Sequence, residues 1–264
     1  PILTGKTTLS IDENETSVAT LTATDVEGDA LTYSLSGTDA ASLSINASSG
    51  LLTFDSAPDY ETKTSYSITV NVSDGSNTST QEITVTVANV NDLTPVITSS
   101  ATFTVDENET SVGTLTATDG DGDNVTFTIS GSELNITSGG VLTFASAPDY
   151  ETKTSYSATV TASDGTNTTA QVISITITDI NEAPTFTSSA SFSAPENQTA
   201  VGTVTATDPE SDSFTFSISG SDFTITSAGE ITFTFTPDYE GVKLFQETVT
   251  ATDSNNSTST QVIT

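Results

Sequence analysis

The chain has 264 residues, and its 35 aspartates and glutamates outweigh four lysines to give a formal net charge of −31 at pH 7. A charge of this size and sign excludes nucleic acid and anionic membrane surfaces as partners. Because the sequence contains no Cys and no His, disulfides, thiolate zinc sites and catalysis by thiol or imidazole groups are excluded as well.

Alternating apolar and polar residues mark the predicted strands, taken here in the first part of the chain. In the clearest run, apolar side chains at 66, 68, 70 and 72 alternate with polar ones, which is the period of a strand with one buried face. Shorter or equal runs cover residues 9–11, 19–23, 31–35, 43–45, 51–54 and 83–87. Glycine and proline separate them, and no segment has a sustained helical period. About seven short strands are typical of an immunoglobulin-like β-sandwich.

This pattern is repeated three times. The segment LSIDENETSVATLTATD at 9–25 returns as FTVDENETSVGTLTATD at 103–119 and as FSAPENQTAVGTVTATD at 192–208. Its marker glutamate falls at Glu13, Glu107 and Glu196, and a proline lies 12 residues before each. We therefore predict three domains, at residues 1–94, 95–183 and 184–264. We expect the third to stop before its own linker and the chain to be a piece of a longer protein.

Two polar segments ending in proline separate the predicted domains. They are NVNDLTP at residues 89–95 and DINEAP at residues 179–184. Such segments are expected at domain boundaries. Their Asp and Asn side chains also carry the oxygen atoms that bind hard cations, so the linkers are candidate metal ligands.

Outside the linkers, acidic residues recur in four motifs per domain, all at predicted strand ends or in loops. The motifs are the Glu of DEN or PEN, a DxD-like run after a strand, the Asp and Glu of PDYE, and the Asp of SDG or its variant. Alternate carboxylates lie on one side of an extended chain, which suits a bound metal ion. A single motif of this kind is more simply interpreted as solvated loop acids. Four motifs that recur in register in three domains favour metal sites.

The combination of PEN, DxD, DYE, DxG and an acidic linker ending in proline resembles the extracellular cadherin repeat over the whole chain. The absence of Cys and the richness in Ser, Thr and Asp are similar to the bacterial cadherin-like domains of large surface or secreted adhesins. The resemblance implies an all-β fold of three tandem seven-stranded Greek-key sandwiches in an extended rod. It also implies up to three calcium ions between successive domains.

When the metal ligands of the family are assigned to this sequence motif by motif, the resemblance implies a set of ligands for each junction. For the first junction the set is Glu13, Asp59, Glu61, Asn89, Asn91, Asp92, Asp119, Asp121 and Asp164. For the second it is Glu107, Asp149, Glu151, Asp179, Asn181, Glu182, Asp208, Glu210 and Asp253. Seven and eight of these are carboxylates, and so many like charges close together need cations. Oxygen ligands in this number favour Ca2+ over zinc or magnesium, and we expect two to three ions per junction.

The linkers depart from the family pattern in ways that bear on the ion count. Asn89 stands where the first Asp is expected, Leu93 where the last Asn is expected, and Glu182 replaces an Asp in a linker that is one residue shorter. The third ion of each junction is therefore the least supported. At the ends of the chain the half-sites have no partner domain, and we expect them to bind metal weakly or not at all.

The predicted function is a calcium-binding structural and adhesive rod of a cell-surface or secreted protein, located outside the cell. Cell-surface glycans or a second copy of the protein are the expected partners, without membrane insertion of this segment, which we expect to be monomeric. A calcium-dependent carbohydrate-binding module is the alternative, and it predicts an exposed aromatic platform on one domain. We do not expect an enzyme, because the acidic pairs recur in every domain and no insertion forms a cleft.

Overall fold

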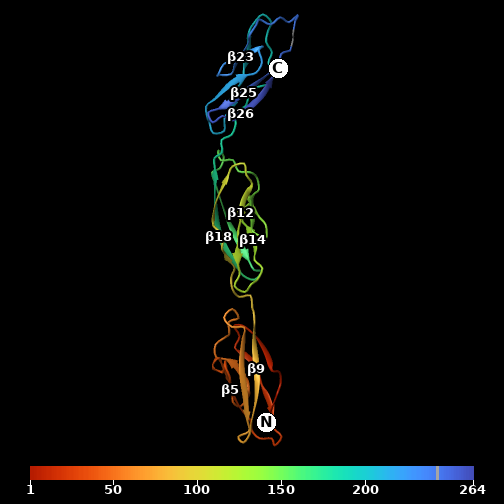
Figure 1. Cartoon of the computed structure of the whole chain (residues 1–264), viewed down its shortest axis with the longest axis vertical. Coiled ribbons are helices and arrows are strands. Elements are labelled where there is room, and N and C mark those ends of the chain that lie inside the picture. Colours follow the sequence, from red (N-terminus) through yellow and green to blue (C-terminus); the bar gives the residue numbers. More distant parts are fainter. Residues whose placement is uncertain (242–243) are drawn as a thin grey trace.

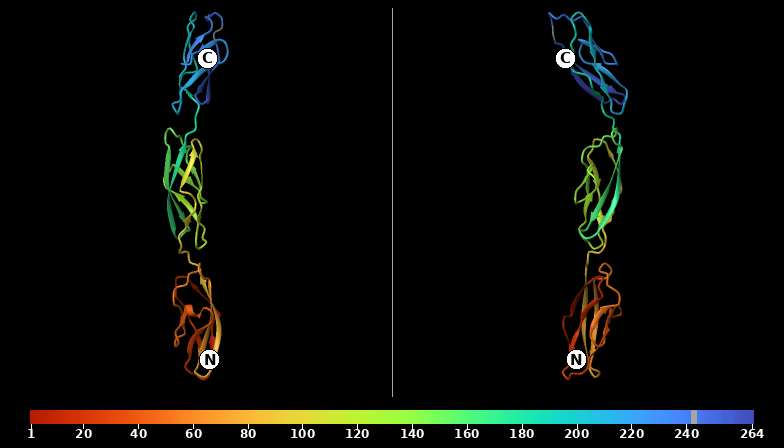
Figure 2. Two further views of the ribbon diagram at one scale, coloured as in Figure 1. Left: turned by 60° about the vertical axis from the view of Figure 1, so that its left-hand side comes forward. Right: turned by 180° about the vertical axis from the view of Figure 1, so that it is seen from behind.

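The computed structural model describes residues 1–241 and 244–264. It consists of three β-sandwiches that follow one another end to end, with the chain termini at opposite ends of a long, narrow molecule (Figure 1). The two further views show the same elongated arrangement, joined by thin connecting segments (Figure 2). The predicted all-β class, three tandem sandwiches in an extended rod, is confirmed by this arrangement.

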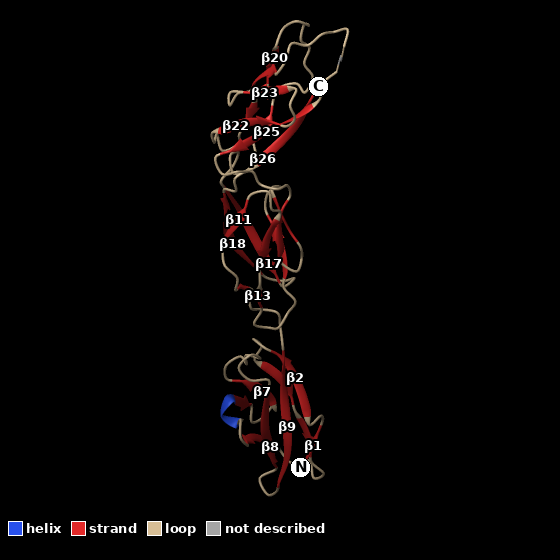
Figure 3. Cartoon of the chain, turned by 45° about the horizontal axis from the view of Figure 1, so that its top comes forward, coloured by secondary structure: helices blue, strands red, loops and turns tan. Residues whose placement is uncertain are grey.

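The first domain contains nine strands and one short 3-10 turn, η1 (Ala40–Ser42), which is the only helical element drawn in Figure 3. Its strands are β1 (Ile2–Thr4), β2 (Thr8–Asp12), β3 (Ser17–Thr20), β4 (Thr22–Thr24), β5 (Thr32–Ser36), β6 (Leu43–Ile45), β7 (Leu51–Phe54), β8 (Ser65–Ser73) and β9 (Thr78–Ala88). Because β1 with β2 and β3 with β4 are the halves of two interrupted strands, this is the expected seven-stranded pattern.

The second domain repeats this order. Its strands are β10 (Val96–Ile97), β11 (Thr102–Asp106), β12 (Ser111–Thr114), β13 (Ala117–Thr118), β14 (Thr126–Ile129), β15 (Leu134–Ile136), β16 (Val141–Phe144), β17 (Ser155–Ser163) and β18 (Thr168–Thr178). The third domain contains β19 (Thr185–Phe186), β20 (Ala200–Thr203), β21 (Ala206–Thr207), β22 (Phe214–Ile218), β23 (Phe223–Ile225), β24 (Glu230–Phe233), β25 (Glu247–Asp253) and β26 (Thr258–Ile263).

Each of the first two domains packs a four-stranded sheet against a three-stranded one. In the first domain the sheets have the orders β2-β9-β8-β5 and β3-β7-β6, and β1 pairs separately with β4. All pairings are antiparallel except that of β2 with β9, which is parallel, as is β11 with β18 in the second domain. The composition alone indicated antiparallel structure. The parallel pair arises because the interrupted first strand crosses from one sheet to the other.

The buried faces of the strands form one hydrophobic core per domain. Val70 and Val72 of β8 are fully buried, as the alternation predicts, and Val160 and Ala162 of β17 occupy the same places in the second domain. The three clusters of buried residues share no members. Each domain is therefore stabilised by its own core, and the domains meet only through linkers and loops.

The last strand of the third domain, β26, runs to Ile263, one residue before the end of the sequence. Ile263 corresponds to Ile83 of β9 and Ile173 of β18, which are buried as it is. A cavity of about 230 Å³ lies beside Ile263, and its lining includes four phenylalanines, among them Phe192. Among the described residues, no helix is long and apolar enough to cross a membrane.

Candidate metal centres at the domain junctions

The glutamate of the first motif anchors each linker to the domain before it. Glu13 follows β2 and is only 3% exposed, and its two carboxylate oxygens accept the backbone N–H groups of Tyr60 and Val90, both at 2.8 Å. One bond reaches the PDYE loop and the other reaches the linker. Glu13 therefore ties two segments that are distant in sequence to the end of β2, leaving further lone pairs on both oxygens.

The second junction uses the same arrangement. Glu107 is 2% exposed and accepts the N–H groups of Tyr150 at 2.8 Å and Ile180 at 2.9 Å. In the third domain Glu196 accepts the N–H of Tyr239 at 3.0 Å. The repeated bond to the PDYE loop explains why these two motifs recur together in the sequence.

The domain after each linker holds it through acidic and amide side chains. At the first junction, Asp121 accepts the N–H groups of Asp92 and Leu93 at 3.0 and 2.8 Å. The amide of Asn89 donates to the backbone carbonyl of Asp121 at 2.9 Å, and the amide of Asn167 donates to the carbonyl of Leu93 at 3.0 Å. At the second junction the N–H of Glu182 donates to Glu210 at 3.2 Å.

These contacts bring acidic side chains from both domains and the linker into compact clusters. In each cluster every residue offers a ligand atom within 4.8 Å of the others. The clusters are Glu13, Glu61, Asp92 and Asp121 at the first junction, Glu107, Glu151, Asp179 and Glu210 at the second, and Asp119, Asp121 and Asp123 at the first. At the second junction the linker supplies Asp179 to the cluster. The first linker has Asn89 at the same position, and there the acidic residue of the cluster is Asp92 instead.

Several carboxylate oxygens at the junctions are buried and have no hydrogen-bond partner among the described residues. They are Asp119 Oδ2, Asp121 Oδ1, Asp164 Oδ2, Asp208 Oδ2 and Glu210 Oε2. A buried carboxylate oxygen without a partner is costly, and buried charges in proteins are normally paired or bound to metal. These five oxygens are therefore the strongest sign that cations belong at both junctions.

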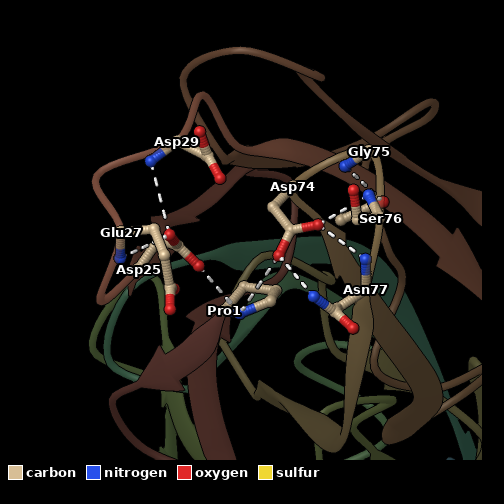
Figure 4. Close-up of polar contacts among 9 residues, drawn as sticks. Pro1, Asp25, Glu27, Asp29, Asp74, Gly75, Ser76 and Asn77 are labelled. Carbon is tan, nitrogen blue, oxygen red and sulfur yellow. Dashed lines mark hydrogen bonds and ion pairs between the residues drawn. The ribbon is translucent and has the colours of Figure 1, made fainter.

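Asp25 and Asp74 of the first domain are the counterparts of Asp119 and Asp164. Figure 4 shows both side chains facing the nitrogen of Pro1. This nitrogen lies 3.1 Å from Asp25 and 3.9 Å from Asp74, and the side chains of both aspartates are at most 5% exposed. The two aspartates therefore lie together at the end of the first domain opposite the first junction (Figure 1).

Crowding of negative charge at the junctions changes the ionisation of three glutamates. Loss of hydration raises the pKa of Glu61, with further contributions from the charges of Glu13 and Asp121. The pKa of Glu151 is raised in the same way, mainly by loss of hydration and also by Glu107. Loss of hydration likewise raises the pKa of Glu210. A bound cation would relieve this repulsion.

Some of the predicted ligands lie near the junctions but make other contacts. The carboxylate of Asp59 accepts the N–H and hydroxyl of Thr62, both at 3.0 Å, and Asp149 holds Thr152 identically. The amide oxygen of Asn91 accepts from Asn167 at 2.8 Å. Asn181 donates to Asp253 at 2.9 Å. These predicted residues lie outside the acidic clusters.

The ligand set predicted from the sequence omitted residues that the structure brings into the junctions. Asp123 joins the third cluster, and it could have been found as the third acid of its motif. The amides of Asn14 and Asn108 donate to Asp92 and Glu182, each at 2.5 Å. Their only signal in the sequence is that they follow the marker glutamate in each domain.

The donor atoms fit calcium. Every available ligand is a carboxylate, amide, hydroxyl or backbone oxygen, because the chain has neither imidazole nor thiolate. Hard oxygen donors in clusters of three or four carboxylates, with room for backbone carbonyls and water, match the coordination preferred by Ca2+.

Curated proteins that resemble the chain are much longer than it. The chain is 33% identical to mouse protocadherin Fat 4 over 214 residues, which is 72% of this chain and 4% of that protein. It is 43% identical over 76 residues to mouse cadherin-related family member 2, covering 29% of this chain and 6% of that protein.

Among solved structures, mouse protocadherin-24 EC1-3 matches with a TM-score of 0.62 and 25% identity over 98% of this chain and 96% of that chain. Mouse cadherin-23 EC22-24 matches with a TM-score of 0.64 and 24% identity over 98% and 95% of the two chains. The second match is below 25% identity and is evidence for the fold alone.

Models of two protein families match the three domains. The cadherin domain matches residues 7–88, and the bacterial Ig domain matches residues 91–178 and 181–264. Both families consist of structural, non-enzymatic domains, and the predicted resemblance is confirmed. The chain therefore belongs to the bacterial Ig domain family over its second and third domains, which follow a cadherin domain.

Proposed function

We propose that this chain is a structural rod that calcium ions at its two junctions make stiff. The five buried, unpartnered carboxylate oxygens at the junctions carry this proposal. Without cations, the like charges of two domains and a linker repel one another at each junction. With cations bound, the same carboxylates would link both domains and the linker through shared ligands, so bending at the linker would require breaking metal contacts.

The clusters support at least one ion at each junction. Glu13, Glu61, Asp92 and Asp121 would hold one at the first junction, and Asp119 with Asp123 would complete a second around the shared Asp121. At the second junction, Glu107, Glu151, Asp179 and Glu210 would hold one, and the unpartnered oxygen of Asp208 supports another. Two ions per junction is the count that we propose.

We further infer that the rod is part of a bacterial cell-surface or secreted adhesin and lies outside the cell. The bacterial Ig match supports a bacterial surface protein, and the cadherin match supports an extracellular location. The net charge of −31 keeps such rods apart when they are crowded on a surface. The adhesive partner would be a surface glycan or a second protein chain.

Small-angle X-ray scattering and thermal unfolding with calcium, and then with a chelator, test the rod. With calcium, the maximum dimension should match three domains in line. With the chelator, the average dimension should shorten and the melting temperature should fall, because the linkers become hinges. Equal extension and equal melting in both conditions would show that calcium does not stiffen the junctions.

A second candidate function, calcium-dependent glycan binding, is favoured by one feature of the third domain. Tyr239 is 59% exposed, and Phe235 near it in sequence is 40% exposed. Tyr60 and Tyr150, which correspond to Tyr239 in the other two domains, are half-buried. Exposed aromatic rings stack on sugars. On a glycan array, Tyr239→Ala should abolish any binding and the matched Tyr60→Ala should preserve it; no binding by the wild-type chain would exclude this function.

A further inference from the structure

The third domain contains a buried glutamate where the other domains have apolar residues. Glu247 begins β25 and lies six residues before Asp253, the position held by Ile68 and Ala158 in the other two domains. Glu247 is 8% exposed, so it is more than nine-tenths buried. Glutamate is rarely buried to this extent unless its charge is paired.

The contacts of Glu247 leave one oxygen without a partner. Its Oε1 accepts the N–H of Asp222 at 2.7 Å, whereas its Oε2 is buried and has no hydrogen-bond partner among the described residues. Gly220 makes room for the carboxylate, since a Cβ there would lie 2.3 Å from Oε1 and 2.5 Å from the carboxyl carbon. The loop therefore packs closely against a carboxylate that has one oxygen without a partner among the described residues.

A cavity of about 530 Å³ adjoins this carboxylate. It is lined by residues 219–222 and 246–248 with Val262, which include the acid Asp222 and the hydroxyl-bearing residues Ser219, Ser221 and Thr248. The corresponding loop acids of the other domains are neutralised: Asp39 pairs with Lys63 at 2.5 Å and Glu133 with Lys153 at 2.6 Å. Among the described residues, no basic side chain forms an ion pair with Asp222.

We propose that Glu247 and Asp222 form a cation site within the third domain, with Ca2+ as the ion it would take. Two carboxylates and neutral oxygens are hard donors, and the open cavity leaves room for the waters that complete the coordination. The site is separate from the junction clusters. Glu247 and Asp253 lie at opposite ends of β25, about 20 Å apart at the rise of an extended strand.

Titration of the whole chain with calcium, followed by amide NMR, tests this site. The Asp222 N–H reports on it directly, because it donates to Glu247. We expect its signal to shift and to saturate with a dissociation constant of roughly 10⁻³ M, as in weak extracellular sites. The N–H groups of Val90 and Ile180, bound to Glu13 and Glu107, report on the junctions in the same spectra.

Two variants separate the charge from the fold. E247Q keeps the size of the side chain and an acceptor for Asp222, and E247I restores the residue type found at Ile68. Both should lose the calcium-dependent shift of Asp222 while the Val90 and Ile180 signals still respond. An unchanged Asp222 signal in the wild-type chain up to about 10⁻² M calcium, or a shift that persists in E247Q, would overturn the proposal.

Lys243, which lies outside the described residues, is the one basic residue of residues 184–264 and supplies the remaining control. K243Q should retain the calcium response of Asp222 seen in the wild-type chain. A response that appears only in K243Q would identify the lysine as the counter-charge, and the proposal would then be wrong.

Discussion

At the scale of single residues, one unusual backbone conformation directs a side chain to the linker of each junction. Asn14 and Asn108 have φ values of 64° and 65°, a left-handed conformation that asparagine tolerates better than most residues. The turn that follows Glu13 directs the amide of Asn14 to Asp92, and the turn after Glu107 directs Asn108 to Glu182. The marker glutamate and the following asparagine therefore act as one unit that holds the linker.

Asp121 is the residue on which the first junction depends most, because it belongs to two acidic clusters and accepts two linker N–H groups. We expect Asp121→Ala to weaken calcium binding at that junction by about tenfold or more. Isothermal titration would measure this. Glu27→Ala, at the same position of the first domain but outside both junctions, should leave binding at the first junction unchanged, and equal losses in both variants would contradict the assignment.

At the scale of elements, the hairpin between β15 and β16 depends on a glycine with a close backbone neighbour. Gly140 has φ of 88°, and a Cβ there would lie 2.2 Å from the carbonyl oxygen of Leu115. Gly50 and Gly229 make the same approach in the other domains, to Leu21 and Val204. This contact joins the hairpin to the strand segment before the DxD loop and so positions the acids that follow it.

Gly140→Ala should destabilise the second domain by about 1–2 kcal/mol for the left-handed conformation alone, with the clash adding to this. Chemical unfolding monitored through the domain's own transition would measure the loss. Gly139→Ala is the matched control, since its Cβ would meet only Thr137 Oγ1 at 3.9 Å and its φ is not positive. Similar losses from both variants would show that the close approach does not constrain the hairpin.

At the scale of the whole molecule, the acidic junctions make stability depend on pH in a way that calcium should reverse. Without metal, Glu61, Glu151 and Glu210 have pKa values raised above their ordinary 4.5. Groups with raised pKa values bind protons more tightly when folded, so their contribution is present below pH 4.5 and is lost as pH rises through the raised values.

In chelator, the melting temperature should therefore fall as pH increases from about 4.5 to 7. The aspartates with lowered pKa values, such as Asp164 and Asp253, act only below their ordinary 3.8 and do not oppose this trend. In excess calcium the slope should be reversed, because protons then compete with the metal for the same oxygens. Calorimetry over this range would check both slopes, and identical slopes would count against metal at the junctions.

Much of the architecture was predictable because it depends on local pattern. Alternation at 66–72 identified β8, and the runs at 43–45 and 51–54 match β6 and β7 residue for residue. The short β1 strand was missed because it is defined by its pairing with β4, a contact between segments about 20 residues apart that its own sequence does not show. The parallel pairing of β2 was missed because register between distant strands depends on how the sheets pack. The boundaries at 1–94, 95–183 and 184–264 and the full ligand list stay predictions.

The sequence by itself determined the three repeats, the class of fold and the chemical type of the junctions, since repetition and oxygen-only ligands are visible in the chain. Only the tertiary structure decided which acids meet. Asp59 holds Thr62 while Glu61, two residues away, joins Glu13 and Asp121 from distant loops. Likewise, Glu247 appears in the sequence as one polar residue near a strand, and its burial is visible only in the fold. Side-chain partners depend on distances between segments, and sequence spacing does not encode them.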